Sequence, residues 1–445
     1  MSRSTNLVER VLSIVGDRAE AEVIARTGRS ELTRFANSFI HQNVSDDIAE
    51  VTVKVSISGR VASATTTNTG DDGLASMVTA AIETAAMQRV DEEFPGFGGP
   101  VDGIDHDRFD DHTASADPSA RAEVVKEFVD AGEGLLAAGM CETDTSYVAY
   151  GNTSGRNASG RYTTAVLDGI HQTETTAGSG HSSGVGLASI DARSAGTLAA
   201  QRARDGRGAF DAKPDSYEVI LAPECMATIA EFLRDYGFSG RRAKEGTSFV
   251  TIGEQRFDAS VNLVDDAFES RALGLGFDAE GTTRNRMALI EGGVTPALLH
   301  NRRTAAHFSD DPNGHAAFAD EGYVDGPTAR NLFFREGNFS EEELIAGVDR
   351  GIYVSTFNYC RVLEEKSLVV TGLTRNGTFM IENGVITGAL TNLRFTQSFL
   401  DALAPGMVSG IGSNGRFANG EEDPAVVHTP SFHLASWNFT GGTDG

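Results

Sequence analysis

The chain has 445 residues, of which 40% are hydrophobic, and a formal net charge of −26. This length exceeds what one ordinary hydrophobic core organises, so we expect two domains. The strong negative charge argues against a nucleic-acid partner and against anionic membrane surfaces. A basic substrate, a basic partner and a salt-adapted source all remain compatible with it.

The cysteines are few and widely spaced, at Cys141, Cys225 and Cys360, with no Cys-x-x-Cys pair. This pattern predicts a reducing compartment, without a disulfide framework or a thiolate zinc site. The first residues have the spacing of an amphipathic helix and lack the continuous apolar segment of a signal peptide. No run reaches membrane-spanning length. We therefore expect a cytoplasmic protein.

The first half of the chain predicts helices over a mostly antiparallel sheet. Residues 7–15 have helical spacing, residues 20–25 form a strand, and residues 50–57 and 61–67 form a hairpin. A second helix follows residues 71–72, and residues 91–118 should form a surface excursion. Asp117 and Pro118 suit the N-cap and first turn of a further helix. Residues 145–187 are consistent with long twisted strands, within which the segment 178–184 indicates a turn.

The second half predicts mostly strands. Residues 203–214 are the best linker candidate, and strands are expected at 260–264, 288–291 and 351–357. Residues 368–390 indicate strands broken by two hairpin turns, at 376–377 and 383–384. Ser340 and Glu343 form a capping box. The predicted fold is α+β: an N-terminal α/β domain, 1–205, and a β-rich C-terminal domain, 206–445, carrying a central helix at 223–237.

The central helix has one apolar and one polar face. Pro223 suits its first turn, and its apolar residues recur at the spacing of a core-facing surface. The opposite face carries three carboxylates and a hydroxyl, and its simplest interpretation is a solvated surface: Glu224, Thr228, Glu231 and Asp235.

Other residues suited to chemistry form weak patterns. The ten histidines include no His-Glu-x-x-His and no His-x-His pair. His171, Glu174 and His181 would suit a metal if a strand pair brought them together, but strands rich in threonine and serine often carry such residues without function. Cys225 lies in the first helical turn, where the helix dipole lowers a thiol pKa, although a lone cysteine is more often a small packed residue.

Several ordered segments resemble the TldD/PmbA (TldD/TldE) family over essentially the whole chain. The most specific lies within residues 368–403, TGLTRNGTFMIENGVITGALTNLRFTQSFLDAL. EELIAGVDRGIYV at 342–354, SELTRFANSFIHQN at 30–43, and the central helix with GTS at 246–248 support it. The resemblance implies a cytoplasmic metallopeptidase, built from TldD and PmbA/TldE subunits, that degrades or trims unfolded peptides and leader segments. It also implies an N-terminal α/β domain, a β-rich C-terminal domain, and a chamber between subunits that encloses the substrate.

In TldD-type members the central helix carries His-Glu-x-x-x-His, whose histidines bind the metal with a later cysteine, while the glutamate acts as general base. With Glu231 placed on that glutamate, Ala230 replaces the first histidine and Asp235 replaces the second. Alanine has no lone pair, and no cysteine follows Cys360. This is the PmbA/TldE pattern. It implies no metal site, catalytic residue or cofactor in this chain, and zinc in a TldD-like partner.

The resemblance therefore implies a PmbA/TldE-like subunit that pairs with a TldD-like subunit and binds peptide, with no nucleic acid and no membrane involved. Two alternatives stay open. One is a self-sufficient homodimeric metallopeptidase, using Glu231 and Asp235 with histidines from the β-rich domain. The other is a non-catalytic peptide-binding protein.

Overall fold

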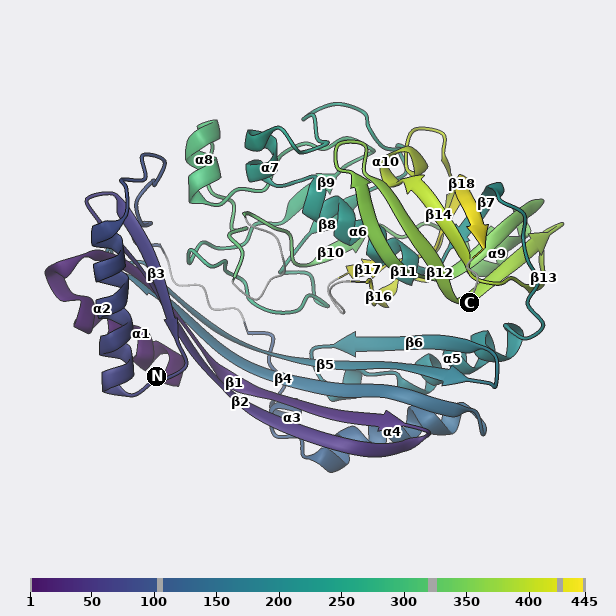
Figure 1. Ribbon diagram of the computed structural model, residues 1–445, viewed down its shortest axis with the longest axis horizontal. Coiled ribbons are helices and arrows are strands. Elements are labelled where there is room, and N and C mark those ends of the chain that lie inside the picture. The colour runs from purple at the N-terminus through teal and green to yellow at the C-terminus, as the bar shows by residue number, and fades with distance from the viewer. Residues whose placement is uncertain (1, 102–106, 319–325, 422–426, 443–445) are drawn as a thin grey trace.

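The structure is a computed structural model that describes residues 2–101, 107–318, 326–421 and 427–442. Figure 1 shows a long curved sheet whose concave face is turned towards a β-rich part of the molecule. The strands of the curved sheet lie between residues 20 and 184, and the strands of the β-rich part between residues 215 and 442. The predicted α+β class is confirmed. The division into two domains at 205/206 stays a prediction.

The curved sheet is fully antiparallel, in the order β3-β2-β1-β4-β5-β6. Its strands are longer than their sequence patterns predicted, because polar residues alternate with small ones far beyond the apolar segments. The segment 178–184, predicted as a turn, lies in β6; its alternate glycines, Gly178 and Gly180, approach a helix too closely for a Cβ. The strands are β1 (Glu20–Ala36), β2 (Phe39–Ile57), β3 (Arg60–Thr66), β4 (Leu136–Asn152), β5 (Asn157–Gln172) and β6 (Ala177–Gly184).

Helices cover the convex face of this sheet in two groups, each with its own hydrophobic core. At one end lie α1 (Arg3–Val15) and α2 (Asp71–Met87); at the other lie α4 (Pro118–Ala131) and α5 (Ala192–Asp205), with the short α3 (Asp111–Ala114) between them in sequence. Asp117 caps α4 by accepting the Ala120 N–H, and Pro118 occupies its first turn, as predicted. The predicted excursion at 91–118 is irregular apart from α3, and its residues 102–106 lie outside the described residues.

The β-rich part contains a small closed barrel. Its strands pair around a ring, β11-β7-β18-β14-β12, and β11 pairs again with β12. Trp437, Phe357, Phe395 and Phe399 stack inside, with ring centroids 4.7–6.5 Å apart. The strands are β7 (Asp215–Leu221), β11 (Arg350–Glu364), β12 (Val369–Glu382), β14 (Leu393–Ser398) and β18 (Phe432–Gly442), with β13 (Val385–Ala389) and β15 (Val408–Ile411) attached to them.

A smaller sheet, β16-β17-β10-β8-β9, completes the β-rich part. It contains β8 (Leu263–Asp265), β9 (Met287–Ile290), β10 (Leu332–Phe334), β16 (Arg416–Ala418) and β17 (Val427–Thr429). The helices are α6 (Pro223–Tyr236), α7 (Gly240–Glu245), α8 (Arg302–Phe308), α9 (Glu341–Ala346) and α10 (Phe399–Ala402). Among the described helices, none is long and apolar enough to cross a membrane.

In the β-rich part, local sequence signals predict caps and turns correctly where no partner strand overrides them. Ser340 and Glu343 form the predicted capping box. The turn at 383–384 joins β12 to β13, as predicted. The turn predicted at 376–377 is wrong: both residues have positive φ, but they form an irregularity inside β12, where the register against β11 shifts. The long partner strand keeps β12 extended through a dipeptide that elsewhere forms a hairpin.

Candidate functional site

Helix α6 lies inside the β-rich part, with nearly every side chain from Pro223 to Arg234 buried. The predicted solvated face is wrong for most of its length: Glu224, Thr228 and Glu231 are 4%, 1% and 0% exposed. Strands β16 and β17 and residues 420–421 cover this face. Helical spacing identified the polar face correctly, but its partners come from distant parts of the chain.

Glu224 is held between two guanidinium groups. Arg202 of α5 donates to its two carboxylate oxygens at 3.3 and 3.4 Å, and Arg416 of β16 donates to both at 2.9 and 3.1 Å. Burial by itself raises the pKa of Glu224, but the two arginines reverse this and bring it to about 2. Glu224 is therefore an ionised structural anion that ties α6 to both halves of the molecule.

The motif positions on α6 do not form a metal centre. Ala230 is fully buried in the hydrophobic core. The carboxylate of Asp235 accepts from Arg234 at 2.7 Å. Zinc in a structural or catalytic site takes at least three histidine, cysteine or carboxylate ligands. These positions supply two carboxylates and a methyl group, so the donor set does not fit zinc. Across the described ranges, no group of three or more His, Cys, Asp or Glu side chains is arranged to hold a metal ion.

The backbone of residues 420–421 packs against the Glu231 carboxylate. Its carboxylate accepts the N–H of Glu421 at 3.1 Å, and a Cβ placed on Gly420 would lie 2.1 Å from its Oε1 atom. The Glu421 carboxylate in turn accepts the Cys360 N–H at 2.6 Å. Glu231 therefore anchors the segment that follows β16.

Cys225 is inert. Burial raises its pKa well above the usual value, with a further contribution from the charge of Glu224. Its thiol donates to the Val354 carbonyl at 3.4 Å. Desolvation thus outweighs the helix dipole, and the packed-residue alternative is the correct one.

The histidines do not converge. His171 points to the convex face of the sheet, where it stacks on Phe128 and contacts its carbonyl. His181 lies on the concave face opposite Asp168, and Glu174 is exposed in the turn between β5 and β6. Because alternate strand residues point to opposite faces, His171, Glu174 and His181 do not come together, and the metal site that they would form on a strand pair is absent from this described part of the sheet.

Three histidines of the β-rich part, where the homodimer alternative takes its ligands, have local hydrogen-bond partners. His315 is fully buried and bonds to Asp265 at 2.8 Å. His428 contacts Arg271 at 2.8 Å, and His300 contacts Thr304 at 3.1 Å. None of these contacts brings a ring nitrogen to Glu231 or Asp235.

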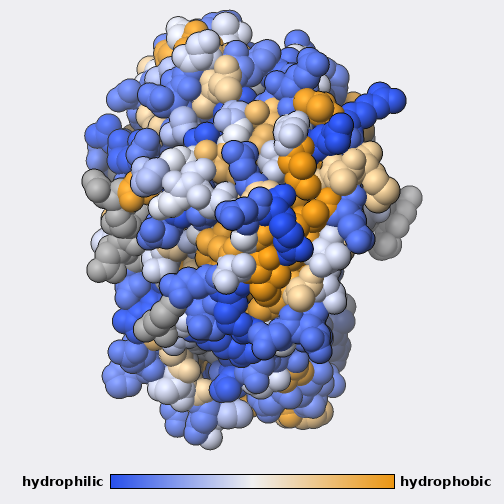
Figure 2. Space-filling model, turned by 90° about the vertical axis from the view of Figure 1, so that its left-hand side faces the viewer, coloured by the Kyte–Doolittle hydropathy of each residue, from blue (hydrophilic) through white to orange (hydrophobic). Residues whose placement is uncertain are grey.

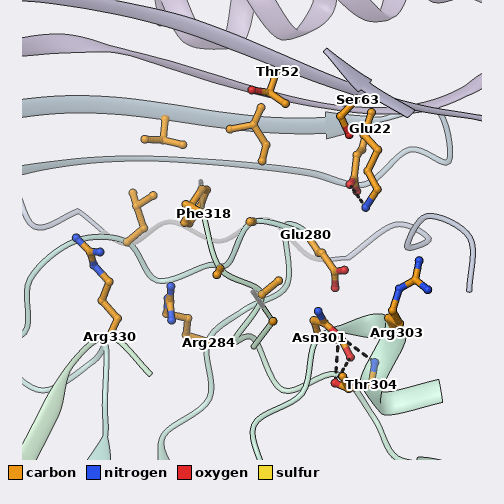
Figure 3. A pocket seen from close by; sticks show the side chains of 18 of the residues that line it. Glu22, Thr52, Ser63, Glu280, Arg284, Asn301, Arg303, Thr304, Phe318 and Arg330 are labelled. Atoms are coloured by element: carbon orange, nitrogen blue, oxygen red, sulfur yellow. Dashed lines mark hydrogen bonds and ion pairs between the residues drawn. The ribbon is translucent and has the colours of Figure 1, made fainter. Parts of the chain in front are cut away.

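A cavity of about 810 Å³ lies between the concave face of the curved sheet and the β-rich part. Glu22, Thr52 and Ser63 point from the sheet towards Glu280 and Arg303 on the opposite wall (Figure 3). Its volume falls in the usual range of ligand pockets. The residues that line this cavity include both acidic and basic side chains, and none of them belongs to α6.

Ion pairs join the two walls of this cavity. Lys244 of α7 bonds to Glu93 at 2.6 Å, and Arg303 of α8 pairs with Asp91 and Glu93. Burial raises the pKa of Glu280 to about 7, assisted by the charge of the neighbouring Asp278. This carboxylate therefore titrates near neutral pH.

A second cavity, of about 870 Å³, lies where β6 meets β16 and β17. Its walls are largely apolar, from Val185, Leu187 and Phe417 among others, with Arg271, Arg416 and His428 at one side. Burial and the charge of Arg271 lower the pKa of His428 to about 4, so its ring is neutral at physiological pH.

The side of the molecule that carries α1, α2 and α8 has a band of hydrophobic surface between hydrophilic flanks (Figure 2). Exposed apolar side chains on or just after these helices include Met87, Val90 and Phe308, which are 80%, 53% and 41% exposed. Contiguous apolar surface of this kind is typical of contact regions.

A family model described as the PmbA/TldA metallopeptidase C-terminal domain matches residues 214–441, just over half of the chain. A metalloprotease of Methanothermobacter thermautotrophicus is 24% identical over 208 residues, which cover 46% of this chain and 44% of that protein. Metalloprotease MJ0996 of Methanocaldococcus jannaschii is 29% identical over 192 residues, 42% of each chain. The aligned segments therefore span less than half of either relative.

Two solved structures have the same fold over nearly the whole chain. TldE from Thermococcus kodakarensis has a TM-score of 0.85 and 16% identity, covering 98% of this chain and 99% of its own. A proposed modulator of a DNA gyrase from Thermotoga maritima has a TM-score of 0.82 and 18% identity, with the same coverage. At such identities the likeness concerns the fold alone.

Proposed function

Because this chain belongs to the PmbA/TldD metallopeptidase family, we propose that it is a TldE-like subunit that pairs with a TldD-like metallopeptidase. In this role it contributes walls of a peptide-binding chamber and leaves the catalytic zinc to its cytoplasmic partner. The observation that carries the proposal is the state of the α6 motif, where Ala230 is buried, Glu231 bonds to backbone and Asp235 bonds to Arg234.

The electrostatics of α6 support the same conclusion. A catalytic glutamate has to reach a water molecule, whereas Glu231 is fully buried and bonds to the Glu421 N–H. The other buried carboxylate of the helix, Glu224, is neutralised by Arg202 and Arg416. The acidic residues of this helix thus have structural tasks, as expected of a subunit that keeps the fold and lacks the chemistry.

Two further features support a role in binding peptide beside a partner. The cavities of about 810 and 870 Å³ are each large enough for several residues of an extended chain, and the first is lined by both acidic and basic side chains. The hydrophobic band of Figure 2 offers a surface that a second subunit would cover. The structure of TldE from Thermococcus kodakarensis, with the same fold, adds to this support.

The first experiment is to express the chain alone and together with a TldD-like protein from the same source, and to measure association, zinc content and hydrolysis of an unfolded polypeptide. We expect the chain alone to be folded, free of stoichiometric zinc and inactive. We expect the mixture to form a complex that holds zinc and cleaves the polypeptide faster than the partner does alone.

The same samples separate the alternatives. Near-stoichiometric zinc in the chain alone, lost in Asp235→Ala, would establish the self-sufficient hydrolase. Peptide binding without any association with the TldD-like protein would establish a non-catalytic peptide-binding protein. A matched control is Asp17→Ala, which removes a carboxylate from a short turn after α1, outside the motif.

A further inference from the structure

Asp168 and His181 face each other on adjacent strands. They are direct partners in the register of β5 and β6, and the His181 Nδ1 atom lies 4.0 Å from Asp168 Oδ1. His181 is only 8% exposed, yet neither ring nitrogen has a hydrogen-bond partner. Buried polar atoms of native proteins are nearly always bonded to protein or to an ordered molecule. The pair therefore indicates a position where something else binds.

His181 belongs to a row of such groups. The Oγ atoms of Ser179 and Ser183, two residues away on either side, are also buried without a hydrogen-bond partner. Alternate residues of a strand share a face, so all three point to the concave side of the sheet. On the other face, Gly178 and Gly180 press against α5. The unsatisfied atoms thus line one surface, at the terminal strand of the sheet.

This surface is accessible from the second cavity. Ser183 lines that cavity of about 870 Å³, and His181 lies roughly 6.6 Å further along the same face, two residues at about 3.3 Å each. The Asp168 side chain is 38% exposed. A long side chain extending from the cavity would pass Ser183 and end between Asp168 and His181.

The charges around the pair favour a cation. Among the described residues, His181 is the one group within ion-pairing distance of the Asp168 carboxylate. Burial lowers the pKa of His181 to about 4, so its ring is neutral and offers a lone pair. The nearby guanidinium groups of Arg202 and Arg416 already bond to Glu224, whose own charge is felt at Asp168. An incoming ammonium or guanidinium group would provide the missing positive charge and the missing donors.

We propose that Asp168 and His181 form a subsite for the basic side chain, lysine or arginine, of a peptide that occupies the 870 Å³ cavity. The cation donates to the Asp168 carboxylate and to one ring nitrogen of His181, its aliphatic stem passes Ser183, and the peptide backbone lies in the cavity lined by Val185 and Phe417. That the ligand is a peptide rests on the proposed function. A metal ion at this place would need a third ligand, which the described residues do not provide.

The test compares two end-blocked peptides, Ala-Ala-Lys-Ala-Ala and the same sequence with norleucine in place of lysine, by fluorescence anisotropy with the full chain. We expect tighter binding of the lysine peptide, and a loss of about tenfold in Asp168→Asn with little change for the norleucine peptide. Asp144→Asn is the matched control, because Asp144 is another desolvated carboxylate on the concave face. It lies in β4 and pairs with Thr164, which is four residues from Asp168 along β5.

The pH profile gives an independent readout. Burial raises the pKa of Asp168 to about 6, with the charge of Glu224 adding to the effect and a bond from Asn419 opposing it. Binding of the lysine peptide should therefore weaken as pH falls through about 6, and Asp168→Asn should remove this dependence. His181→Phe keeps the shape of the side chain without its lone pair and should also weaken lysine binding.

Equal affinity for the two peptides, or an equal loss of both in Asp168→Asn, would overturn the subsite. Zinc binding by the chain that is lost in Asp168→Asn would also overturn it, in favour of a metal. Association with a TldD-like protein, measured on the same variants, keeps the two proposals apart: lysine preference without association would sustain the subsite and reject the subunit role.

Discussion

Glu224 and Asp168 are two desolvated carboxylates that lie close enough to influence each other, and they have opposite environments. Two arginines surround Glu224 and bring its pKa to about 2. Among the residues that the structure describes, no cation neutralises Asp168, and its pKa is raised to about 6. Burial acts on both in the same direction, so the difference comes from the partners alone.

This contrast assigns different tasks to two neighbouring surfaces, the polar face of α6 and the concave side of β6. The α6 surface, which carries the motif positions Ala230, Glu231 and Asp235, is saturated by ion pairs and backbone bonds. The β6 surface retains unsatisfied polar atoms, which destabilise the fold unless a ligand or water satisfies them. We therefore expect a functional site at the β6 surface, where polar atoms lack partners, and not at the α6 motif positions.

The largest expected effect comes from removing the ion pairs of Glu224. Glu224→Gln leaves the buried Arg202 and the partly buried Arg416 without their anion, so we expect a loss of about 3–5 kcal/mol in the free energy of unfolding. Chemical denaturation measures it. The exposed Glu83→Gln on α2 is the control and should change little. A loss below about 1 kcal/mol, the range of surface pairs, would contradict the structural role of Glu224.

The same cluster predicts an acid limit. The pKa of Glu224 is about 2 in the folded chain, below its ordinary value of 4.5. Its contribution to stability is therefore complete above pH 4.5 and is lost as pH falls towards 2. In Glu224→Gln, this part of the acid dependence of the unfolding free energy should disappear.

Glu231→Ala should have a smaller effect. It leaves the Glu421 N–H without its acceptor, which costs about 1–3 kcal/mol in unfolding free energy. Glu231→Gln keeps an acceptor oxygen and should cost less than the alanine variant. Equal losses in both variants would mean that the charge of Glu231, and not this hydrogen bond, stabilises the fold.

Gly420→Ala examines the same contact from the other side. The added Cβ would lie 2.1 Å from Glu231 Oε1, so either the carboxylate or the backbone has to move. Overpacking of this kind costs about 1–3 kcal/mol in unfolding free energy. Gly441→Ala meets no atom within 4 Å and is the control. We expect Glu231→Ala to remove most of the penalty, because the clashing atoms are then absent.

The sequence predicted the fold class, several helix caps and the polar face of α6, because these depend on neighbours within a few residues. It missed that this face is buried, since Glu224 finds its partners at residues 202 and 416. It missed the joint position of Asp168 and His181 because strand register, set by the whole sheet, brings them together. Strand register also separates His171 from His181, a pair that the sequence alone left undecided.

At the α6 motif, the family resemblance and the contacts in the structure give different information. The resemblance identified Ala230 and Asp235 as substituted positions and Glu231 as the retained glutamate, which spacing alone does not reveal. It gave no account of what Glu231 and Asp235 do instead. That required the contacts with the Glu421 N–H and with Arg234, which come from a distant loop and from the adjacent residue. The two cavities have no local sequence signal, because their walls come from many separate segments.

The smallest expected effect comes from Asp168, and here the substitution should raise the free energy of unfolding instead of lowering it. The pKa of Asp168 is higher in the folded chain than its ordinary value of 3.8, so ionisation destabilises the fold as pH rises from about 4 through about 6. Asp168→Asn removes this penalty. It should stabilise the chain at pH 7, and the gain should vanish at pH 4. Because the side chain is 38% exposed, solvent screening keeps the gain below about 1 kcal/mol. Thermal unfolding of both variants at the two pH values measures it. A destabilised Asp168→Asn at pH 7 would mean that the bond from Asn419 to the carboxylate outweighs its desolvation, and the contrast with Glu224 would no longer hold.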